Sequence, residues 1–332
     1  MKKTLYLCGV NMTKLTECLT LRKTKMKKFN SSFGALMGAA LLGTVMNLSS
    51  CSNDTEEVLN PLNNESIGYA PVRVHVSDFS YSVEDLPGTR SAVSPASYED
   101  VQAITLAFYS GATEVCKVTQ LKSDRSTYET FGDFSCSLPL GTYTMVVVAR
   151  DSLAGDVFTL TSPTVAAYTS EKVRETFAKT QDVDVNSTAG LDLGTITLER
   201  AISKLGILST DTRPANATKI RITFGGGSKS FSPATGQAVG DAGFVTVSTP
   251  KTAVGKTIGS INCLFLATDE EVMDVTIEVL NAADEVLYTK VVEDVPFKRN
   301  RLTYLRGALF NGNVSSSFKL ETAWDNEVYK DF

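Results

Sequence analysis

The sequence predicts an all-β protein made of two β-sandwich domains, the first of which also carries a short helix. Three observations lead to this prediction. Apolar and polar residues alternate in many short segments, Gly, Pro, Asn or Asp bound these segments at regular spacing, and helical periodicity is almost missing. The chain has 332 residues, of which 42% are hydrophobic, so it is long and apolar enough to form two cores.

The first predicted domain, residues 69–195, opens with a clear alternation. Val72, Val74 and Val76 alternate with polar neighbours, which places His75 on the polar face of a strand. Residues 143–149 (YTMVVVA) are apolar on both faces, which is typical of a central strand. Further strands are predicted at residues 101–109, 114–121 and 191–198.

The short helix is predicted over residues 170–179 (SEKVRETFAK). Ser170 can cap its start, and Glu171 and Glu175 favour its positive end. Val173 and Phe177 are four residues apart and would share one face. We expect this helix in a crossover loop.

The second predicted domain, residues 196–332, continues the β pattern, with the boundary near residues 194–199. In the final strand, residues 316–324, Phe318, Leu320, Thr322 and Trp324 fall on one face, so Trp324 is expected in the core. The other strands are predicted at 201–208, 220–224, 243–248, 258–266, 272–280, 286–292 and 301–309.

The N-terminal part indicates export. Residues 33–48 form an uncharged run that is short for a membrane span, and Lys27 and Lys28 precede it. The following Leu-Ser-Ser-Cys, residues 48–51, resembles the lipobox of bacterial lipoproteins, in which Cys51 would be acylated and become the new N-terminus. The alternative is a buried helix that ends in a chance cysteine.

Three divisions of the N-terminal part follow from this interpretation. Residues 1–25 have no role in such a signal, so we expect translation to start at Met26 and residues 26–50 to be the signal peptide. Residues 51–68 are polar and predict a lipidated tether. Its acidic start resembles the segment after the lipid cysteine in surface-exposed lipoproteins of Bacteroidetes, while a plain solvated spacer explains the composition equally well.

Charge and histidine content exclude several functions. Residues 1–50 hold eight of the 32 Lys and Arg and one of the 37 Asp and Glu, so the chain without them has a net charge near −12. This acidity argues against nucleic-acid binding. His75 is the single histidine, which leaves no histidine-based metal site or catalytic triad. No catalytic residue, cofactor or metal site is therefore predicted.

Three local motifs are interpreted as turns or loops. Gly225–Gly227 lacks the spacing of a phosphate-binding loop and is expected to form a hairpin turn or bulge. The segment Gly255-Lys256-Thr257 lacks the first glycine of that motif. The acids at 269–271 do not follow the pattern of a calcium loop and are expected in a solvated turn.

Three cysteines remain once Cys8, Cys18 and Cys51 are set aside: Cys116, Cys136 and Cys263. Cys116 and Cys136 fall in strands that could be neighbours, so a disulfide is one interpretation in an exported protein. The odd count and the apolar surroundings favour buried free thiols.

Four strings together resemble fimbrillin-type lipoproteins of Bacteroidetes, most closely the FimB-type fimbrial subunits, which are lipid-anchored partners of type V pili. The strings lie in the order of that family over most of the chain. They are residues 131–150 (FGDFSCSLPLGTYTMVVVAR), 196–207 (ITLERAISKLGI), 295–310 (VPFKRNRLTYLRGALF) and 317–324 (SFKLETAW).

The resemblance implies two transthyretin-like Greek-key sandwiches, an outer-membrane location and other fimbrial subunits, above all a stalk protein, as partners. It also implies assembly by β-strand exchange, in which one subunit lends a strand to a groove in the next. In stalk subunits a protease cuts after an arginine to open that groove. Arg90, in the loop LPGTRSAV, would be the corresponding residue here, although an ordinary loop arginine is the simpler interpretation.

Two functions follow as hypotheses. The first is a non-enzymatic fimbrial anchor or accessory subunit that supports adhesion at the cell surface. The short chain end after Trp324 leaves little room for an additional donor strand, which favours an anchor or minor subunit over a stalk subunit. The alternative is a surface lipoprotein that binds glycans for nutrient capture.

Overall fold

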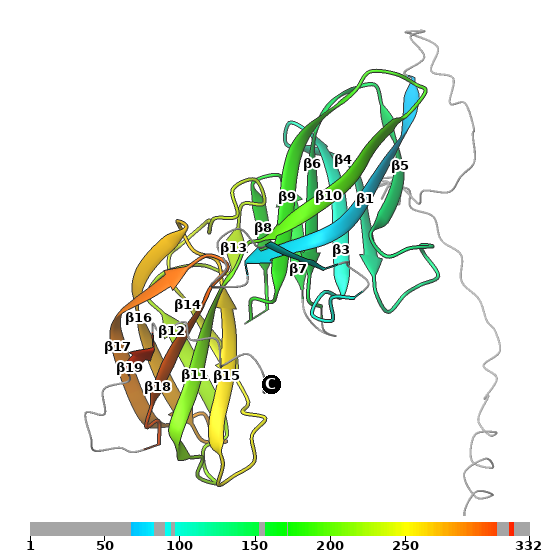
Figure 1. Ribbon diagram of the computed structural model, residues 1–332. Helices are drawn as coiled ribbons and strands as arrows, with labels where there is room; N and C mark the ends of the chain where they lie inside the picture. Colours follow the sequence, from blue (N-terminus) through cyan, green and yellow to red (C-terminus); the bar gives the residue numbers. More distant parts are fainter. Residues whose placement is uncertain are drawn as a thin grey trace, which may run out of the picture. The chain divides into compact units, whose positions relative to one another are not determined.

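The computed structural model describes residues 68–82, 90–93, 97–152, 157–170, 172–310 and 319–321. These residues form an all-β architecture, which confirms the predicted fold class, and the arrangement is sandwich-like (Figure 1). The predicted final strand 316–324 is seen in part, because residues 319–321 alone are described. Trp324 lies outside the described residues.

The first group of strands forms one sheet of eight. Its order is β2-β1-β10-β9-β6-β3-β4. β5 also pairs with β1, on the edge away from β10. The bounds are β1 Tyr69–Ser82, β2 Arg90–Val93, β3 Ala103–Ser110, β4 Thr113–Leu121, β5 Asp133–Pro139, β6 Gly141–Arg150, β9 Thr176–Val185 and β10 Leu191–Arg200.

This sheet wraps around a core made from the inward faces of its strands. Ile104, Leu106 and Phe108 of β3 are at most 1% exposed and belong to that core. The intervening Ala107 and Tyr109 are also buried, but they belong to a separate apolar cluster on the other face of the sheet, which is the third cluster described below. β3 and β6 are therefore covered on both faces, as the apolar run at residues 143–149 predicted.

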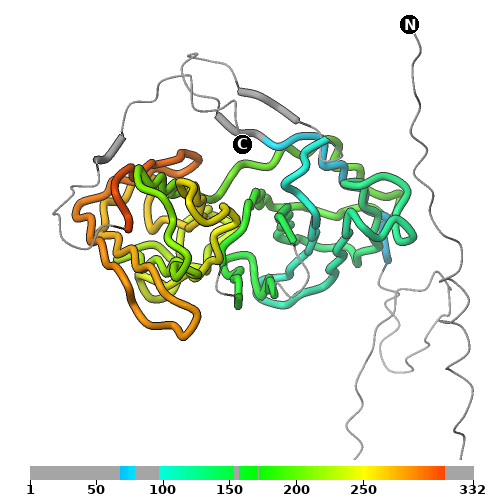
Figure 2. Tube along the Cα trace, turned by 90° about the horizontal axis from the view of Figure 1, so that it is seen from below, coloured from blue at the N-terminus to red at the C-terminus, as the bar shows by residue number. Residues whose placement is uncertain are grey.

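The second group, drawn mainly from green to orange-red in Figure 2, forms a sandwich of two four-stranded sheets around its own core. One sheet has the order β15-β11-β18-β19 and the other β14-β12-β16-β17. The bounds are β11 Ser203–Thr212, β12 Lys219–Phe224, β14 Phe244–Ser248, β15 Thr257–Leu264, β16 Glu270–Leu280, β17 Val286–Lys298, β18 Leu302–Gly307 and β19 Lys319–Glu321.

A small third sheet joins segments from both halves of the chain. It has the order β13-β8-β7, with β7 Phe158–Ser162, β8 Val165–Tyr168 and β13 Ser230–Phe231. Phe231 is fully buried and stacks on Phe265 with ring centroids 4.2 Å apart, and Tyr168 packs against the same ring. The two halves thus share a third apolar cluster.

The predicted helix over residues 170–179 is wrong. The second part of this segment is the start of β9, which pairs with β6 and β10. Phe177 and Ala178 point to opposite faces and are both buried in separate clusters, as adjacent residues of a covered strand must be. Val173 forms an isolated β-bridge with Cys263 rather than a helical turn.

The turn predicted at residues 269–271 is also displaced. β16 begins at Glu270, which pairs with Lys298 of β17. Glu271 accepts hydrogen bonds from the backbone N–H groups of Gly227 and Ala267 at 3.0 and 2.8 Å. The second glutamate therefore fixes two turns, because a carboxylate can satisfy two backbone donors at once.

The glycines at 225–227 form the bend that follows β12. Gly227 has φ of +63°, and a Cβ there would lie 2.7 Å from the backbone oxygen of Phe265, so this position requires glycine. β13 rather than a helix follows this bend, which agrees with the turn predicted from the sequence.

The strand at the predicted domain boundary is continuous. β10 passes through residues 194–199, and its partners are β1 and β9. Ser203 of β11 is the first residue that pairs within the second group of strands. The division of the chain at residue 195 stays a prediction. These pairings show that the remainder of β10, up to Arg200, still belongs to the first sheet.

Candidate functional site

Strand β1 is the first strand of the described chain, and both of its edges are paired with other strands. It pairs in parallel with β10 on one side and antiparallel with β5 on the other (Figure 1). Its alternate residues Val72, Val74 and Val76 are at most 2% exposed, and Phe79 is fully buried further along. The period-2 pattern seen in the sequence therefore becomes the row of side chains that fills the first core.

Of the residues predicted as sites, Cys51 lies outside the described part of the chain. Arg90 is the first residue of β2, and its backbone is paired with Ser82 near the end of β1. The predicted processing position therefore lies at the return of a hairpin that β1 itself forms. Both predicted roles, lipidation at Cys51 and cleavage at Arg90, stay predictions.

The outer edges of β4 and β5 face each other, and we call this place the β4/β5 seam. Gln120 spans it: the Nε2 amide donates to the backbone oxygen of Asp133 at 2.6 Å, and the Oε1 atom accepts from Gly132 N at 2.8 Å. Further along the seam, the side chains of Cys116 and Cys136 are in hydrogen-bond contact. Side chains rather than a backbone ladder therefore hold the seam.

A pocket of about 600 Å³ opens beside the β4/β5 seam. His75 lies on the polar face of β1, as predicted, and its ring nitrogen pairs with the Asp133 carboxylate. Both side chains are about half exposed, and Arg73 and Tyr128 also line the pocket. The pocket thus combines the aromatic rings of Tyr128 and Phe134 with hydrogen-bonding side chains.

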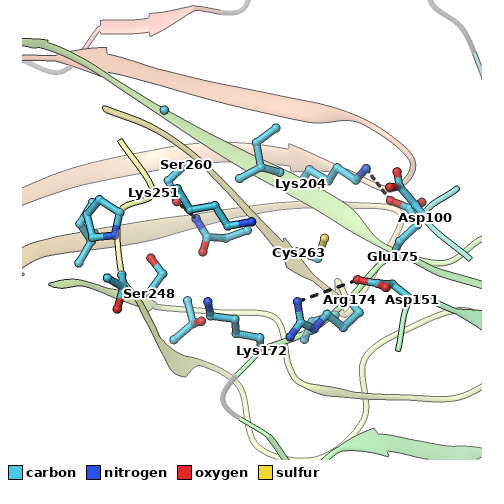
Figure 3. Close-up of a pocket in the computed structure, with 18 residues that line it drawn as sticks. Asp100, Asp151, Lys172, Arg174, Glu175, Lys204, Ser248, Lys251, Ser260 and Cys263 are labelled. Atoms are coloured by element: carbon cyan, nitrogen blue, oxygen red, sulfur yellow. Dashed lines mark hydrogen bonds and ion pairs between the residues drawn. The ribbon is translucent and has the colours of Figure 1, made fainter. Parts of the chain in front are cut away.

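A second pocket of about 410 Å³ is lined by residues from both halves of the chain (Figure 3). Its acidic residues, Asp100, Asp151 and Glu175, lie on the right of the view. Lys172 and Lys251 lie toward the other side. The pocket therefore has an acidic end and an end that presents amino groups.

Glu175 is the centre of the acidic end. Its side chain is 5% exposed, and its two oxygens bind Arg200 Nε and Lys204 Nζ, each at 2.5 Å. Arg200 also donates to Asn300 Oδ1 at 2.9 Å and to the Tyr98 hydroxyl at 2.8 Å. One buried carboxylate thus joins the start of β9, the end of β10 and the start of β11.

The pKa values at this centre follow from burial and the ion pairs. Burial by itself lowers the pKa of Lys204, but the Glu175 carboxylate outweighs it, so the pKa of Lys204 is above its ordinary value. The same two opposing causes act on Arg200, with the same result. Both cations therefore stay charged, and the carboxylate is neutralised by its own chain.

The pocket does not present an activated nucleophile at Cys263. Burial raises the pKa of the Cys263 thiol to about 12, which keeps it protonated at neutral pH. The chemistry offered at the other end is that of Lys172, Lys251 and the hydroxyl of Ser248, a set that suits an anion. The arrangement therefore favours binding of an anion, and ion pairing between the two halves of the chain, over group transfer.

Within the described ranges, no three His, Cys, Asp or Glu side chains gather closely enough to hold a metal ion. In the same part of the chain, no helix is long and apolar enough to cross a membrane.

Sequence reasoning missed the Glu175 centre, and it indicated the β4/β5 seam only through Cys116 and Cys136 as possible neighbours. Glu175 was interpreted as a residue of a helix start, while its partners lie 25 and 29 positions further on. The available signal was weak: Arg200 and Lys204 lie at the junction of two predicted strands, where two cations need an acidic partner. The seam left a weaker signal in the alternation of Cys116, Val118 and Gln120.

The all-β fold with two cores defines the class of protein, and the sequence defines the family. Residues 74–332 match a family of unknown function, DUF6562, and the chain belongs to this family. A comparison with curated proteins finds no match.

Solved structures similar to this chain come from Bacteroidetes. One is an adhesin candidate from Bacteroides ovatus, with 11% identity, a TM-score of 0.45 and coverage of 70% of this chain and 84% of that one. Another is a polysaccharide-binding candidate from Bacteroides thetaiotaomicron (11%, 0.44, 71% and 90%). A third is the fimbrial anchor protein Mfa2 from Porphyromonas gingivalis (10%, 0.42, 72% and 90%).

These neighbours include fimbrial and adhesin proteins of Bacteroidetes, the group that the sequence strings resembled. Their identities and scores are too low to transfer a function. We therefore base the proposed function on residues of this chain.

Proposed function

We propose that this chain is a non-enzymatic, lipid-anchored fimbrial subunit of the anchor or accessory kind. Three features support the proposal: the lipobox-like residues 48–51, the fimbrillin-like strings in family order, and an all-β fold with two cores. In this proposal Cys51 carries fatty acyl chains that hold the protein in the outer membrane at the cell surface. Other fimbrial subunits, including a stalk protein, are its partners.

The observation that carries the proposal is the position of β1. This strand follows the predicted tether directly, and it fills the first core with Val72, Val74, Val76 and Phe79. Hydrogen bonds on both edges, to β10 and to β5, hold it in the sheet. A lipid attached ahead of β1 would therefore pull on a strand that is bonded along both sides.

The same geometry suits β-strand exchange. A strand that supplies alternate side chains to a groove and main-chain hydrogen bonds to its edges is the donor used in β-augmentation. β1 is such a strand within its own subunit. Cleavage after Arg90, at the start of β2, would cut the covalent link between β1 and the rest of the sheet. We propose that an anchor subunit is spared this cut and so keeps both β1 and its lipid.

The test of the anchor role is the N-terminus of the protein isolated from the outer membrane. We expect mass spectrometry to find a chain that begins at acylated Cys51 and contains β1. A chain that begins at Ser91 would contradict the anchor role and would indicate a processed stalk subunit.

The test of lipidation uses metabolic labelling with an alkyne-bearing fatty acid. Cys51→Ser should lose the label and leave the outer-membrane fraction, while Cys263→Ser should keep both and serves as the matched cysteine control. Equal labelling of the Cys51→Ser variant and the unchanged protein would contradict lipidation at that residue.

The test of the fimbrial role is crosslinking and pull-down with a C-terminal tag. We expect recovery of a fimbrial stalk protein and, after gene deletion, altered pilus length or retention. Unchanged pili on a strain that expresses the protein would contradict the proposal.

The pocket beside the β4/β5 seam favours glycan binding as the alternative function. Tyr128 offers a ring, and Arg73, His75 and Asp133 offer the directional hydrogen bonds that sugars require. On a glycan array, binding that Tyr128→Ala abolishes and that the exposed substitution Tyr69→Ala leaves unchanged would support this alternative. Equal binding by both variants, or none by the unchanged protein, would rule it out.

A further inference from the structure

The β4/β5 seam joins two strands that each have one backbone partner among the described strands. β4 pairs with β3, and β5 pairs with β1. Besides the Gln120 hydrogen bonds, the described contacts across the seam include the pair Cys116 and Cys136. A covalent bond between Cys116 and Cys136 would therefore strengthen the closure of the first sheet at this seam.

Both cysteines face the same interior. In β4 the inward positions are Cys116, Val118 and Gln120, and in β5 they are Phe134, Cys136 and Leu138. Cys116 and Cys136 are half-buried and pack against the first core from its margin. Their inward alternation brings the two sulfurs together across the seam rather than turning either outward.

The two thiols also interact chemically. The Cys136 S–H donates a hydrogen bond to the Cys116 sulfur, which lowers the pKa of Cys116 although burial and Glu114 oppose this effect. A thiol with a lowered pKa has a larger thiolate fraction and reacts faster with disulfides. Cys263 has the opposite environment, because burial raises the pKa of its thiol to about 12.

We propose that Cys116 and Cys136 form a disulfide that staples the β4/β5 seam once the chain meets a disulfide oxidant. In the structure the two side chains meet as hydrogen-bonded thiols, and oxidation would replace this hydrogen bond by a covalent bond. Cys263 stays a free thiol in both forms.

The reaction is thiol–disulfide exchange. The Cys116 thiolate attacks one sulfur of the oxidant, and the other sulfur leaves as a thiolate that takes up a proton. The Cys136 thiol then loses its proton and attacks Cys116, which releases the second half of the oxidant as a thiol. Two protein thiols become one disulfide, and one disulfide of the oxidant becomes two thiols.

The staple would act on unfolding. The cysteines are 20 positions apart, and closing a loop of this length restricts the unfolded chain. It also locks the edge that must move before β1 or β5 can leave the first sheet. We expect the first thermal transition of the oxidised protein to lie roughly 6–12 °C above that of the reduced protein.

The experiment uses the chain from residue 52 to 332, oxidised with glutathione disulfide, then denatured and alkylated. Trypsin separates the two cysteines, since Lys117, Lys122 and Arg125 lie between them. We expect the peptides 91–117 and 126–150 to be joined without reductant and separate with it. Cys263 should be alkylated in both samples.

Calorimetry supplies the second readout, and its main comparison, the oxidised wild-type protein with and without reductant, requires no variant. Reductant should lower the transition of the oxidised wild-type protein and that of Cys263→Ala by the same amount, while Cys116→Ala and Cys136→Ala should show no shift. Full alkylation of Cys116 and Cys136 after oxidation would overturn the proposal, and so would a disulfide from either to Cys263 or between two chains. A linked pair without any shift in transition temperature would overturn the stapling role.

Discussion

Glu175 is the buried partner of two partly buried cations, and its replacement by glutamine tests how the two halves of the chain are braced. The glutamate side chain is 5% exposed, and those of Arg200 and Lys204 are 12% and 24% exposed. Glu175→Gln keeps the shape and removes the charge. The two cations then remain in a site of low polarity without the carboxylate that neutralised them.

The expected magnitude follows from that burial. Removing one partner of a buried ion pair costs about 3–5 kcal/mol, because the desolvated charge that remains is uncompensated. For a chain of this size each kcal/mol lowers the melting temperature by about 2–4 °C, so Glu175→Gln should lower it by roughly 6–20 °C. Differential scanning calorimetry measures this shift directly.

The matched control is Glu270→Gln. Glu270 pairs with Lys298 at the same 2.5 Å, but the two side chains are 67% and 55% exposed. Water already solvates both charges there, so no measurable change is expected. A melting temperature of Glu175→Gln within about 2 °C of the wild-type value would refute the reasoning, since the buried carboxylate would then contribute no more than a surface one.

A double variant separates the charge effect from simple loss of packing. In Glu175→Gln/Lys204→Met, one of the two uncompensated cations is gone. The loss should therefore be smaller than the sum of the two single losses, by about 0.5–3 kcal/mol. Strict additivity would indicate that Glu175 and Lys204 stabilise the protein independently.

Three further predictions concern turns, titration and packing. Gly227→Ala should destabilise by more than the roughly 1 kcal/mol expected for Gly255→Ala in urea titrations, because both have positive φ but an added Cβ meets backbone at 2.7 Å only at Gly227; equal losses would contradict this. The raised pKa of Cys263 stabilises the fold below about pH 9, and this contribution falls as pH rises toward about 12, so melting temperatures measured across that range should decline less for Cys263→Ala than for wild type. Phe231→Ala should cost about 3–5 kcal/mol in chemical denaturation, because its ring is fully buried in the cluster shared by both halves; a loss under about 1 kcal/mol would show that this cluster is not cohesive.

The alternation of apolar and polar residues was sufficient for most strands. β1, β4, β12 and β16 follow a period of two with one buried face, and β3 and β6 are apolar on both faces because both are covered. Such patterns are local consequences of burial, so they can be read without knowing the partner strands. β2, β7, β8 and β13 were not predicted, because strands of two to five residues between turn residues leave few positions on which a pattern can be judged.

The error over residues 170–179 has a physical cause. Val173 and Phe177 are four residues apart and would share one face of a helix, but in the structure they lie in different apolar clusters. The glutamates favoured the helical interpretation. Glu175 instead balances Arg200 and Lys204, and no helix N-terminus is involved. Tertiary pairing with β6 decided in favour of a strand.

The site residues also divide into those that can be predicted from neighbouring residues and those that depend on the tertiary fold. The predicted lipidation of Cys51 depends on a contiguous motif, and the surface position of His75 depends on strand alternation, so both come from neighbouring residues. The contact between Cys116 and Cys136 depends on where two strand edges meet, and nothing in their separate segments fixes that meeting.

The sequence by itself determined the all-β class, the polar face of β1, the turn at Gly227 and an acidic body behind a basic leader, because each arises from local periodicity, composition or backbone conformation. The tertiary structure decided that β10 continues in the first sheet beyond residue 195, that Glu175 braces both halves, and that Cys116 and Cys136, possible neighbours from the sequence, do meet across a seam. These features require segments distant in the chain to be packed together, and the free energy that selects them comes from burial and charge neutralisation in the assembled fold.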